Sequence, residues 1–397
     1  MDTLLVIGSG SQSYREYALK ALAEKYAIVL LHTSPLSWQK PYVIDTAQVV
    51  LSDKDSVLDA ARQMAKKYRL AGVFTYDEPS LEIAAIVAQD LHVLHNKREA
   101  ILASRDKSLM RQRWQHYGVP SARSCLSFSL EEAREAALTI GFPVVVKPRS
   151  MAASIGVMQV QNLEELTRAF AVAKSPHPMF QSVLPGVLVE EYLDGPEISV
   201  ESVLYDGVVH IVAITHKQTG LAPYFEEIGH MVSPDEPPDA YPAICETVVA
   251  AHQALGITMG VTHAEVRLTS SGPRMIEINA RVAGDFIPQI VSLACGIDLT
   301  VAGANCASGT VPSLQPQFAK AAAIHFIYPD QGVRIHALEI GAGVSRLPQI
   351  HRVEWLTKPG DEVRLPPQNY VARLGFVIAT GQSMQECKNA ITSALDL

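Results

Sequence analysis

The sequence predicts an α/β protein with more than one domain, and three observations lead to this fold class. Residues 3 to about 104 alternate short apolar runs with longer amphipathic segments, the pattern of a parallel sheet connected by helices. Residues 141–200 contain short strands that carry a lysine and several glutamates. Residues 260–282 form two alternating segments around a short turn, which is typical of an antiparallel hairpin. With 397 residues, the chain has room for two or three domains with substantial cores.

Composition narrows the classes of function. Hydrophobic residues make up 48% and charged residues 19%, a globular balance, and a net charge of -8 disfavours a general nucleic-acid surface. The five cysteines are scattered without a CxxC pair, which argues against a zinc site or disulfide framework and favours a reducing compartment. The start of the chain lacks the basic region of a signal peptide, and no apolar run approaches the roughly 20 residues that span a bilayer. We therefore expect a cytoplasmic protein with no nucleic-acid or membrane partner.

The first predicted domain is an α/β unit over residues 1–104. Gly8-Ser-Gly10, after the first strand, resembles the start of a dinucleotide-binding fingerprint, but the third glycine is missing, and the alternative is a plain tight turn. Asp77-Glu78 ends the fourth strand, where open α/β sheets bind ligands; the alternative is a helix cap. The predicted strands are 4–7, 28–32, 48–51 and 73–76, and the predicted helices are 13–25, 55–68 and 80–89.

The middle of the chain presents two lysines in a defined context. Lys107 lies in the first turn of a helix predicted over 105–117, and a lone lysine there is usually solvated. Ser129 and Glu132 predict a capping box at the start of the next helix. A buried strand then ends at Lys147 and is followed by a loop of small residues, 150–156, and a second strand. Such a loop can bring backbone N–H groups against phosphates, although it does not match a P-loop.

The predicted hairpin places two carboxylates opposite each other. A three-residue loop, 270–272, would pair Glu265 with Glu277, although a bulge beside the turn would shift this register by one. At about 5 Å and an effective dielectric of about 20, their repulsion is roughly 3 kcal/mol, so a cation between them is expected. Oxygen ligands suit Mg²⁺. The alternative is an ordinary hairpin with a solvated, charged face. The polar side chains on this face are His263, Glu265, Arg267, Glu277, Asn279 and Arg281.

The order of these features resembles that of the ATP-grasp ligases, over roughly residues 105–300. The matching series is the lysine strand, small loop, second strand, helix, glutamate-rich strand 187–193, bend, Glu197 and carboxylate hairpin. The resemblance implies ATP and Mg²⁺ as cofactors. It also implies an N-terminal parallel α/β domain, an ATP-grasp module at 105–314 with a mobile lid at about 118–192, and a C-terminal α+β appendage at 315–397.

The resemblance assigns a role to each matching residue. The two lysines contact phosphates, the small loop closes over them, the connector lines the adenine slot, and a carboxylate holds the ribose. The single glycine of the lid loop is fewer than in many members. Arg281 resembles the arginine that binds the transferred phosphate or the acyl oxygens, and Arg267 beside it suits phosphate or carboxylate groups. The implied nucleotide-binding residues are Lys107, Lys147, Ser154, Gly156, Glu190, Glu191, Tyr192, Leu193 and Glu197, and the implied metal ligands are Glu265, Glu277 and Asn279.

The substrate side resembles that of the bacterial L-amino-acid ligases and the dapdiamide-type antibiotic ligases. Residues 225–234 match the segment that faces the amino-acid site, with Glu227 and His230 at the corresponding positions; the alternative is a loop salt bridge or cap. The turn after Arg281, which includes Gly284, resembles the turn that receives the substrate carboxylate or amine. His263 is expected to support a neighbouring ligand by hydrogen bonding. Residues 373–381 resemble the ending of the same branch, for which we expect only a packing role.

The resemblance implies an ATP-dependent carboxylate–amine ligase. Such an enzyme joins amino acids or small acids into a dipeptide-like amide through an acyl phosphate and releases ADP and phosphate. One alternative is another acyl-phosphate enzyme of this fold, of purine-pathway or carboxylase type. A second is a non-catalytic nucleotide-binding module. A homodimer is common among relatives and is a possible assembly.

Overall fold

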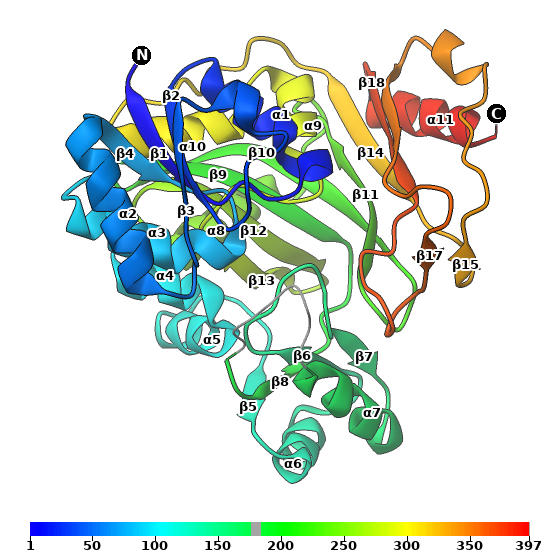
Figure 1. The fold of residues 1–397 in the computed structure, drawn as a ribbon. Helices are drawn as coiled ribbons and strands as arrows, with labels where there is room; N and C mark the ends of the chain where they lie inside the picture. The colour runs from blue at the N-terminus through cyan, green and yellow to red at the C-terminus, as the bar shows by residue number, and fades with distance from the viewer. Residues whose placement is uncertain (176–183, 397) are drawn as a thin grey trace.

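The computed structural model describes residues 1–175 and 184–396 and contains four sheets (Figure 1). The first sheet is parallel, with strand order β3-β2-β1-β4. Strand β3 lies at Asp45–Gln48, so the strand predicted at 48–51 was placed too late; the apolar residues Val49 and Leu51 follow the strand. The elements here are β1 (Thr3–Ile7), α1 (Gln12–Ala23), β2 (Ala27–His32), η1 (Lys40–Tyr42), β3, α2 (Lys54–Lys67), β4 (Leu70–Phe74), η2 (Glu78–Ser80) and α3 (Leu81–Asp90).

Two helices connect this sheet to the rest of the chain. The single helix predicted at 105–117 is interrupted, because α4 (Arg98–Arg105) ends one residue before Asp106 and α5 (Lys107–His116) begins one residue after it. The Asp106 carboxylate accepts hydrogen bonds from the first backbone N–H groups of α5. This cap fixes Lys107 as the first residue of α5.

A four-stranded antiparallel sheet with order β5-β8-β6-β7 follows and forms the lower lobe in Figure 1. The predicted capping box is present, since Glu132 N–H donates to Ser129 Oγ at 3.2 Å. The predicted lid range, 118–192, includes residues 176–183, which lie outside the described residues. The elements are β5 (Ser124–Ser127), α6 (Leu130–Ile140), β6 (Val144–Pro148), β7 (Met158–Val160), α7 (Leu163–Lys174) and β8 (Val187–Glu191).

The central sheet is antiparallel and has eight strands in the order β13-β12-β9-β10-β11-β14-β18-β16. The stretch 225–234, for which a loop was considered, is mostly strand β11 at the heart of this sheet. The strands expected in the C-terminal appendage extend the same sheet, and a two-stranded sheet, β15-β17, lies beside it. The strands are β9 (Glu197–Tyr205), β10 (Val208–Gly220), β11 (Glu226–Val232), β12 (Gly260–Thr269), β13 (Gly272–Asn279), β14 (Ala321–Ile327), β15 (Val333–Arg334), β16 (Ile350–Trp355), β17 (Glu362–Val363) and β18 (Gly375–Gly381).

The hairpin β12–β13 has the predicted pairing of Glu265 with Glu277, but it reaches this register by another route. Thr269 pairs with Gly272, so the loop has two residues rather than the predicted three. A bulge between Glu265 and Val266 then adds one residue to β13, which restores the pairing. The predicted loop length was wrong, and the two differences cancel at the carboxylates.

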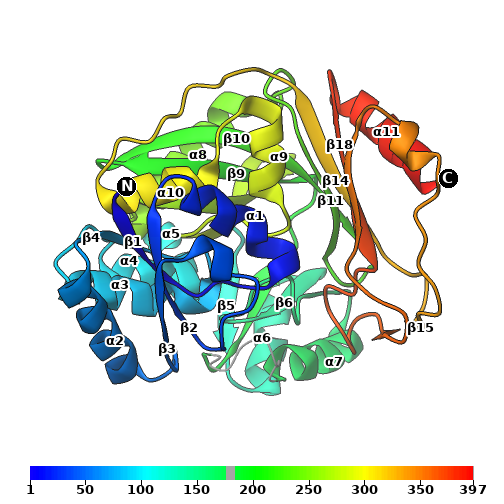
Figure 2. The ribbon, with the colours of Figure 1, turned by 45° about the horizontal axis from the view of Figure 1, so that its top comes forward.

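The main core lies between the parallel sheet and the eight-stranded central sheet, where helices pack against both. Figure 2 shows α9 and α10 beside α1 and the parallel sheet, and apolar side chains of all these elements form one cluster. Among the described residues, no single helix is long and apolar enough to cross a membrane; α9 and α10 reach that length only as a pair bent by 98°. The remaining helices are α8 (Tyr241–Leu255), α9 (Ile287–Cys295), α10 (Leu299–Ser308), η3 (Val344–Arg346) and α11 (Met384–Leu395).

Candidate active site

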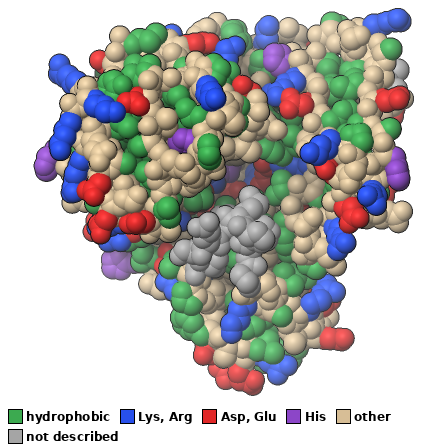
Figure 3. Space-filling model, in the orientation of Figure 1, with side chains coloured by type: hydrophobic (Ala, Val, Ile, Leu, Met, Phe, Trp, Pro, Cys, Tyr) green, Lys and Arg blue, Asp and Glu red, His purple; other side chains and the backbone are tan. Residues whose placement is uncertain are grey.

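A cleft lies between the lower lobe and the central sheet, and it contains almost every residue predicted for the site. In Figure 3 the lower lobe projects beneath the main body, and charged side chains of both signs are interspersed over this face. The exceptions are Gly156 and His230, which do not line the cleft. The predicted residues that do line it are Lys107, Lys147, Ser154, Glu190, Glu191, Tyr192, Leu193, Glu197, Glu227, Glu265, Arg267, Glu277, Asn279 and Arg281.

The two lysines enter the cleft from different elements and are both buried. Lys107, at the start of α5, places Nζ 3.0 Å from Glu277 and donates to the carbonyl of Met151 in the small-residue loop. Lys147, near the end of β6, places Nζ 2.5 Å from Glu190. Burial lowers the pKa of Lys147, and Glu190 opposes that effect. Lys107 is therefore a paired cleft residue rather than the solvated surface lysine that its helical position suggested.

Glu190 sits at the base of the cleft between two cations. Arg111, one helical turn after Lys107, places Nε 2.9 Å from Glu190 and donates to the carbonyl of Ile276 at 2.6 Å. Burial opposes ionisation of Glu190, but Arg111 and Lys147 outweigh it and lower its pKa to about 2. Because Ile276 precedes Glu277 at the bulge, Arg111 ties both the lower lobe and the carboxylate hairpin to α5.

The loop and connector residues occupy the lower side of the cleft. Ser154 lines it in a left-handed backbone conformation, with φ +53°, next to Ala153 at +57°. Gly156, at φ +73°, lies against Pro148, where a Cβ would come within 2.9 Å of a ring carbon. Glu191 is held outside the buried cluster by Arg123, with Nε at 3.3 Å. In the small-residue loop, 150–156, glycine is therefore required only at position 156, where the backbone packs against Pro148.

Lys217 gathers three carboxylates at the centre of the site. Its Nζ lies 2.7 Å from each of Glu197, Glu227 and Glu265, and the lysine side chain is 1% exposed. Burial disfavours the charged lysine, but the three carboxylates hold its pKa well above the usual value. Residues expected to serve ribose, metal and substrate thus share one cation.

The hairpin supplies a set of oxygen donors that fits Mg²⁺. Glu265 and Glu277 are paired across the strands, Asn279 is paired with His263 two residues along, and all line the cleft. The imidazole of His263 lies 2.9 Å from Glu201 and 3.4 Å from Glu265. Burial lowers the pKa of His263, but Glu201 and Glu265 raise it to about 10. His263 therefore orients Glu265 as a charged hydrogen-bonding neighbour, as the sequence predicted.

Arginines flank the carboxylates on two sides. Arg281, just after β13, donates through Nε to Glu78 at 2.8 Å and through Nη1 to the carbonyl of Val282. Glu78 thus holds a cleft-lining arginine, and neither Asp77 nor Ser80 makes a side-chain cap at the start of η2 or α3. Arg267 lies 3.0 Å from Glu197.

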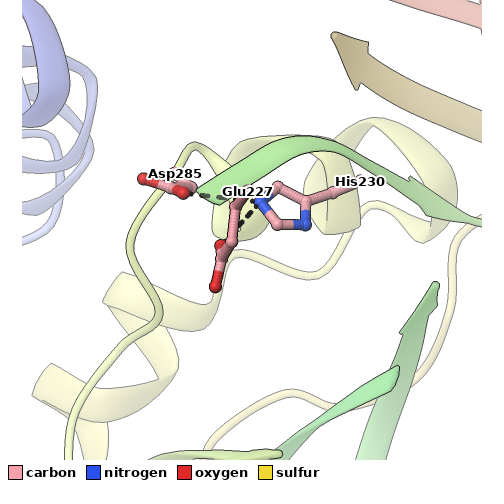
Figure 4. Close-up of side chains that lie close together, drawn as sticks. All are labelled: Glu227, His230 and Asp285. Atoms are coloured by element: carbon pink, nitrogen blue, oxygen red, sulfur yellow. Dashed lines mark ion pairs between the residues drawn. The ribbon is translucent and has the colours of Figure 1, made fainter. Parts of the chain in front are cut away.

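The substrate-side residues form a charged cluster on β11 and the turn before α9 (Figure 4). The His230 imidazole lies 3.1 Å from Glu227 and 3.5 Å from Asp285, behind the cleft wall that these two carboxylates form. Burial lowers the pKa of His230, but Asp285 and Glu227 outweigh it and raise the pKa above its usual value. Arg373 pairs with Asp285 at 2.5 Å and, against the cost of burial, holds the pKa of that carboxyl well below its usual range.

Sequence reasoning did not identify several of these residues. Lys217 lies in a strand without a motif, and Arg373 lies in a segment to which only packing was assigned. Arg111 did carry a signal, since it is a charged residue on the helix face that buries Met110 and Trp114. The signals for Lys217 and Arg373 exist only in three dimensions, because their partners come from distant strands and turns.

Comparison with known proteins agrees with this architecture. Residues 140–289 match the model of the ATP-grasp domain, and residues 325–397 match that of the L-amino acid ligase C-terminal domain 2. In structure, an L-amino acid ligase from Bacillus licheniformis superimposes with a TM-score of 0.84 at 22% identity, covering 100% of this chain and 97% of that one. The predicted fold class is therefore confirmed.

Two curated relatives are similar in sequence. Dapdiamide A synthase of Enterobacter agglomerans is 28% identical over 249 residues, 61% of this chain and 58% of that protein. Alanine–anticapsin ligase of Bacillus subtilis is 27% identical over 307 residues, 70% of this chain and 64% of that protein. The matches thus span less than two thirds of these relatives' lengths. The chain therefore contains an ATP-grasp domain followed by a C-terminal domain of the L-amino acid ligase type.

Proposed function

We propose that this protein joins a carboxylate to an amine, with amino acids as substrates, in an ATP-dependent reaction that forms a dipeptide-like amide. The observation that carries the proposal is the continuity of one cleft. It runs from the lysines Lys107 and Lys147, past the carboxylate pair of the hairpin, to Glu227 and Asp285 on the substrate side. ATP with Mg²⁺ is the cofactor of this family, and the similar proteins include an L-amino acid ligase and an alanine–anticapsin ligase.

The first chemical step is transfer of the terminal phosphate to a carboxylate oxygen. The carboxylate attacks the γ-phosphorus, the bond to the β-phosphate oxygen breaks, and ADP leaves, so that an acyl phosphate remains. Glu265, Glu277 and Asn279 would hold Mg²⁺, which when bound would neutralise charge on the phosphates. The protein positions the reactants: Lys107 and Lys147 bind phosphate oxygens, and Arg281 binds the transferred group.

The second step forms the amide bond. The free amine attacks the acyl carbon, its excess proton is released, and inorganic phosphate leaves with the electrons of the broken C–O bond. Arg281 stabilises negative charge on the acyl oxygens during this attack. The small-residue loop, 150–156, covers the phosphates and limits hydrolysis of the acyl phosphate by water.

Glu227, in the acidic wall that it forms with Asp285, binds the ammonium group of an amino acid. His230, behind the wall, keeps both carboxylates in place. The carboxylate of the same substrate then points toward Arg281, which lines the same part of the cleft. This orientation brings the reacting carboxylate oxygen toward the metal and phosphate side.

Phosphate release measured with single amino acids and with pairs tests the proposal. Release that requires ATP, Mg²⁺ and two amino acids, together with a new amide in the mass spectrum, supports it. Release that requires one carboxylate and bicarbonate or a ribonucleotide precursor would favour a purine-pathway or carboxylase-type reaction. Nucleotide binding without release under any condition would indicate a non-catalytic module.

We also propose a reducing, cytoplasmic setting and small-molecule partners. All five cysteines are free in the structure. A homodimer stays a prediction, and light scattering of the purified protein decides between monomer and dimer.

A further inference from the structure

The turn that closes the substrate side of the cleft has an unusual backbone. Asp285 and Phe286, which follow Gly284, have φ values of +53° and +58°. Two consecutive non-glycine residues in the left-handed region are strained, and such strain persists only where the surroundings hold it. Gly284 and Asp285 line the cleft, so this strained turn forms part of the wall that meets the substrate.

One side chain from the far end of the sequence holds this turn. Arg373 donates through Nη1 to Asp285 Oδ1 at 2.7 Å and through Nη2 to Oδ2 at 2.5 Å, a two-pronged pairing. The same guanidinium donates through Nε to Tyr328 at 3.1 Å and lies 3.6 Å from the centre of the Phe326 ring. Contacts within the C-terminal domain thus hold the Arg373 guanidinium in the orientation that pairs with Asp285.

Arg373 reaches the other substrate-side residue as well. Its Nη2 donates to the backbone carbonyl of Glu227 at 3.2 Å. The preceding Glu226 accepts hydrogen bonds from Tyr328 at 2.8 Å and from the backbone N–H of Val371 at 2.9 Å. The C-terminal segment therefore holds both carboxylate-bearing edges of the wall, the start of β11 and the turn before α9.

We infer that Arg373 is a positioning and specificity-determining residue that fixes the Asp285 turn and neutralises the Asp285 carboxylate toward the substrate. The inference rests on the amino-acid ligase function proposed above and extends it to the C-terminal domain. The geometry gives two separable effects. Arg373 keeps the wall in place, and it limits the negative charge that Asp285 adds beside Glu227, the carboxylate that meets the substrate ammonium group and that is itself paired with Lys217.

Loss of Arg373 would leave the Asp285 carboxylate without its main cationic partner. The Asp285 side chain is 22% exposed and lines the cleft, and without its arginine its charge would be balanced only in part, by His230 at 3.5 Å. A substrate with a second cation in its side chain gains more from that extra negative charge than a substrate with an uncharged side chain, while both lose the fixed wall. A merely structural arginine would not change selectivity in this direction.

The test compares wild type with Arg373→Met, Arg373→Lys and the double variant Arg373→Met/Asp285→Asn. A screen of amino-acid pairs first identifies a productive partner, and L-methionine and L-lysine, which have similar side-chain lengths, are then compared as the second substrate. We expect Arg373→Met to raise the KM for the amino acid by roughly tenfold or more while the Kd for ATP stays within about twofold. The ratio of kcat/KM for lysine over methionine should rise in this variant and return toward wild type in the double variant. Arg373→Lys keeps the charge but cannot pair with both Asp285 oxygens through two N–H groups, so it should restore KM only in part.

Arg352→Met is the matched control, because Arg352 comes from the same segment and lies 5.5 Å from the Phe286 ring without an ion pair to Asp285. It should leave both KM and selectivity near wild type. Equal losses for ATP and amino acid in Arg373→Met, or an unchanged lysine-to-methionine ratio, would overturn the inference.

Hydrogen exchange separates this inference from the proposed function. Arg373→Met should speed exchange of the backbone N–H groups of residues 284–290 relative to wild type and Arg352→Met, whether or not turnover is seen. Unchanged exchange there would overturn the positioning role. A wild-type protein that releases no phosphate with any pair would overturn the proposed function, and the specificity role with it, while the exchange result would still decide the positioning role.

Discussion

Glu265 and Glu277 lie directly opposite each other on adjacent strands, and each carboxylate pairs with a different lysine. Nζ of Lys217 is 2.7 Å from Glu265, and Nζ of Lys107 is 3.0 Å from Glu277. The repulsion expected between the paired carboxylates is therefore offset by two cations that approach from different elements. A divalent cation bound between the carboxylates would add to this arrangement.

Replacement of Glu277 tests the metal assignment. Glu277→Gln should lower kcat by about 100-fold or more, because the amide keeps the shape of the side chain but loses the charge that binds Mg²⁺. The circular dichroism spectrum should stay that of wild type. Glu362→Gln, at an exposed position of β17, should leave kcat unchanged. Full activity of Glu277→Gln would refute the assignment.

The nucleotide product tests the mechanism. Transfer of the terminal phosphate gives ADP and inorganic phosphate, whereas adenylation of the carboxylate would give AMP and pyrophosphate. We expect ADP to form in a one-to-one ratio with the amide, as measured by phosphorus NMR or by chromatography. Detection of AMP as the main product would mean that the lysines and Arg281 do not act as proposed.

Local patterns in the sequence were enough to predict much of the fold. Alternation of apolar and polar residues located both strands of the hairpin, and the cap at Ser129 located a helix start. The strand predicted at 48–51 was wrong because apolar residues after β3 pack into the core without strand pairing. The two-residue hairpin loop was missed because a compensating bulge leaves no clear sequence signal.

The same distinction holds for the site: residues in local sequence motifs were predicted, and residues whose role depends on distant partners were not. Residues presented by motifs, such as Lys147 and Glu197, were found and line one cleft. Lys217 and Arg373 were missed because their importance comes from partners far away in the sequence. Lys217 has no distinctive sequence context, and its role follows only from the three carboxylates, on three strands, that surround it. Such convergence can be read only from the folded chain.

Replacement of Glu227 tests the substrate side. Glu227→Ala should raise the KM for the amino acid by roughly tenfold or more, since the residue supplies an ion pair to the ammonium group. The Kd for ATP should change by less than that, because Glu227 pairs with Lys217 and His230, whereas Lys107 and Lys147, the lysines proposed to bind phosphate, pair with other carboxylates. Isothermal titration with ATP and steady-state kinetics with the amino acid separate the two. A larger effect on ATP would remove residues 225–234 from the substrate site.

Replacement of Arg111 tests whether the buried pair supports the cleft. Arg111→Met leaves Glu190 with Lys147 alone and frees the carbonyl of Ile276, so the free energy of unfolding should fall by about 3 kcal/mol. The double variant Arg111→Met/Glu190→Gln should recover part of the loss, because no carboxylate is left with half of its partners. Urea denaturation of the single and double variants measures both. Arg113→Met, which loses one hydrogen bond to the carbonyl of Leu255, is a control on the same helix.

The buried His252 makes stability depend on pH below neutrality. Its ring contacts the carbonyl of Val248 at 2.7 Å and the hydroxyl of Thr262 at 2.7 Å, and burial lowers its pKa to about 4. The unfolded chain binds a proton near pH 6.5 while the folded chain does not, so stability falls as pH decreases from about 6.5 to about 4. A shift of this size contributes roughly 3 kcal/mol across that window. In His252→Gln the loss between pH 7 and pH 4.5 should be smaller than in wild type by about 2–3 kcal/mol, measured by urea denaturation at both pH values. Equal losses in the two proteins would show that other groups dominate the acid sensitivity of this fold.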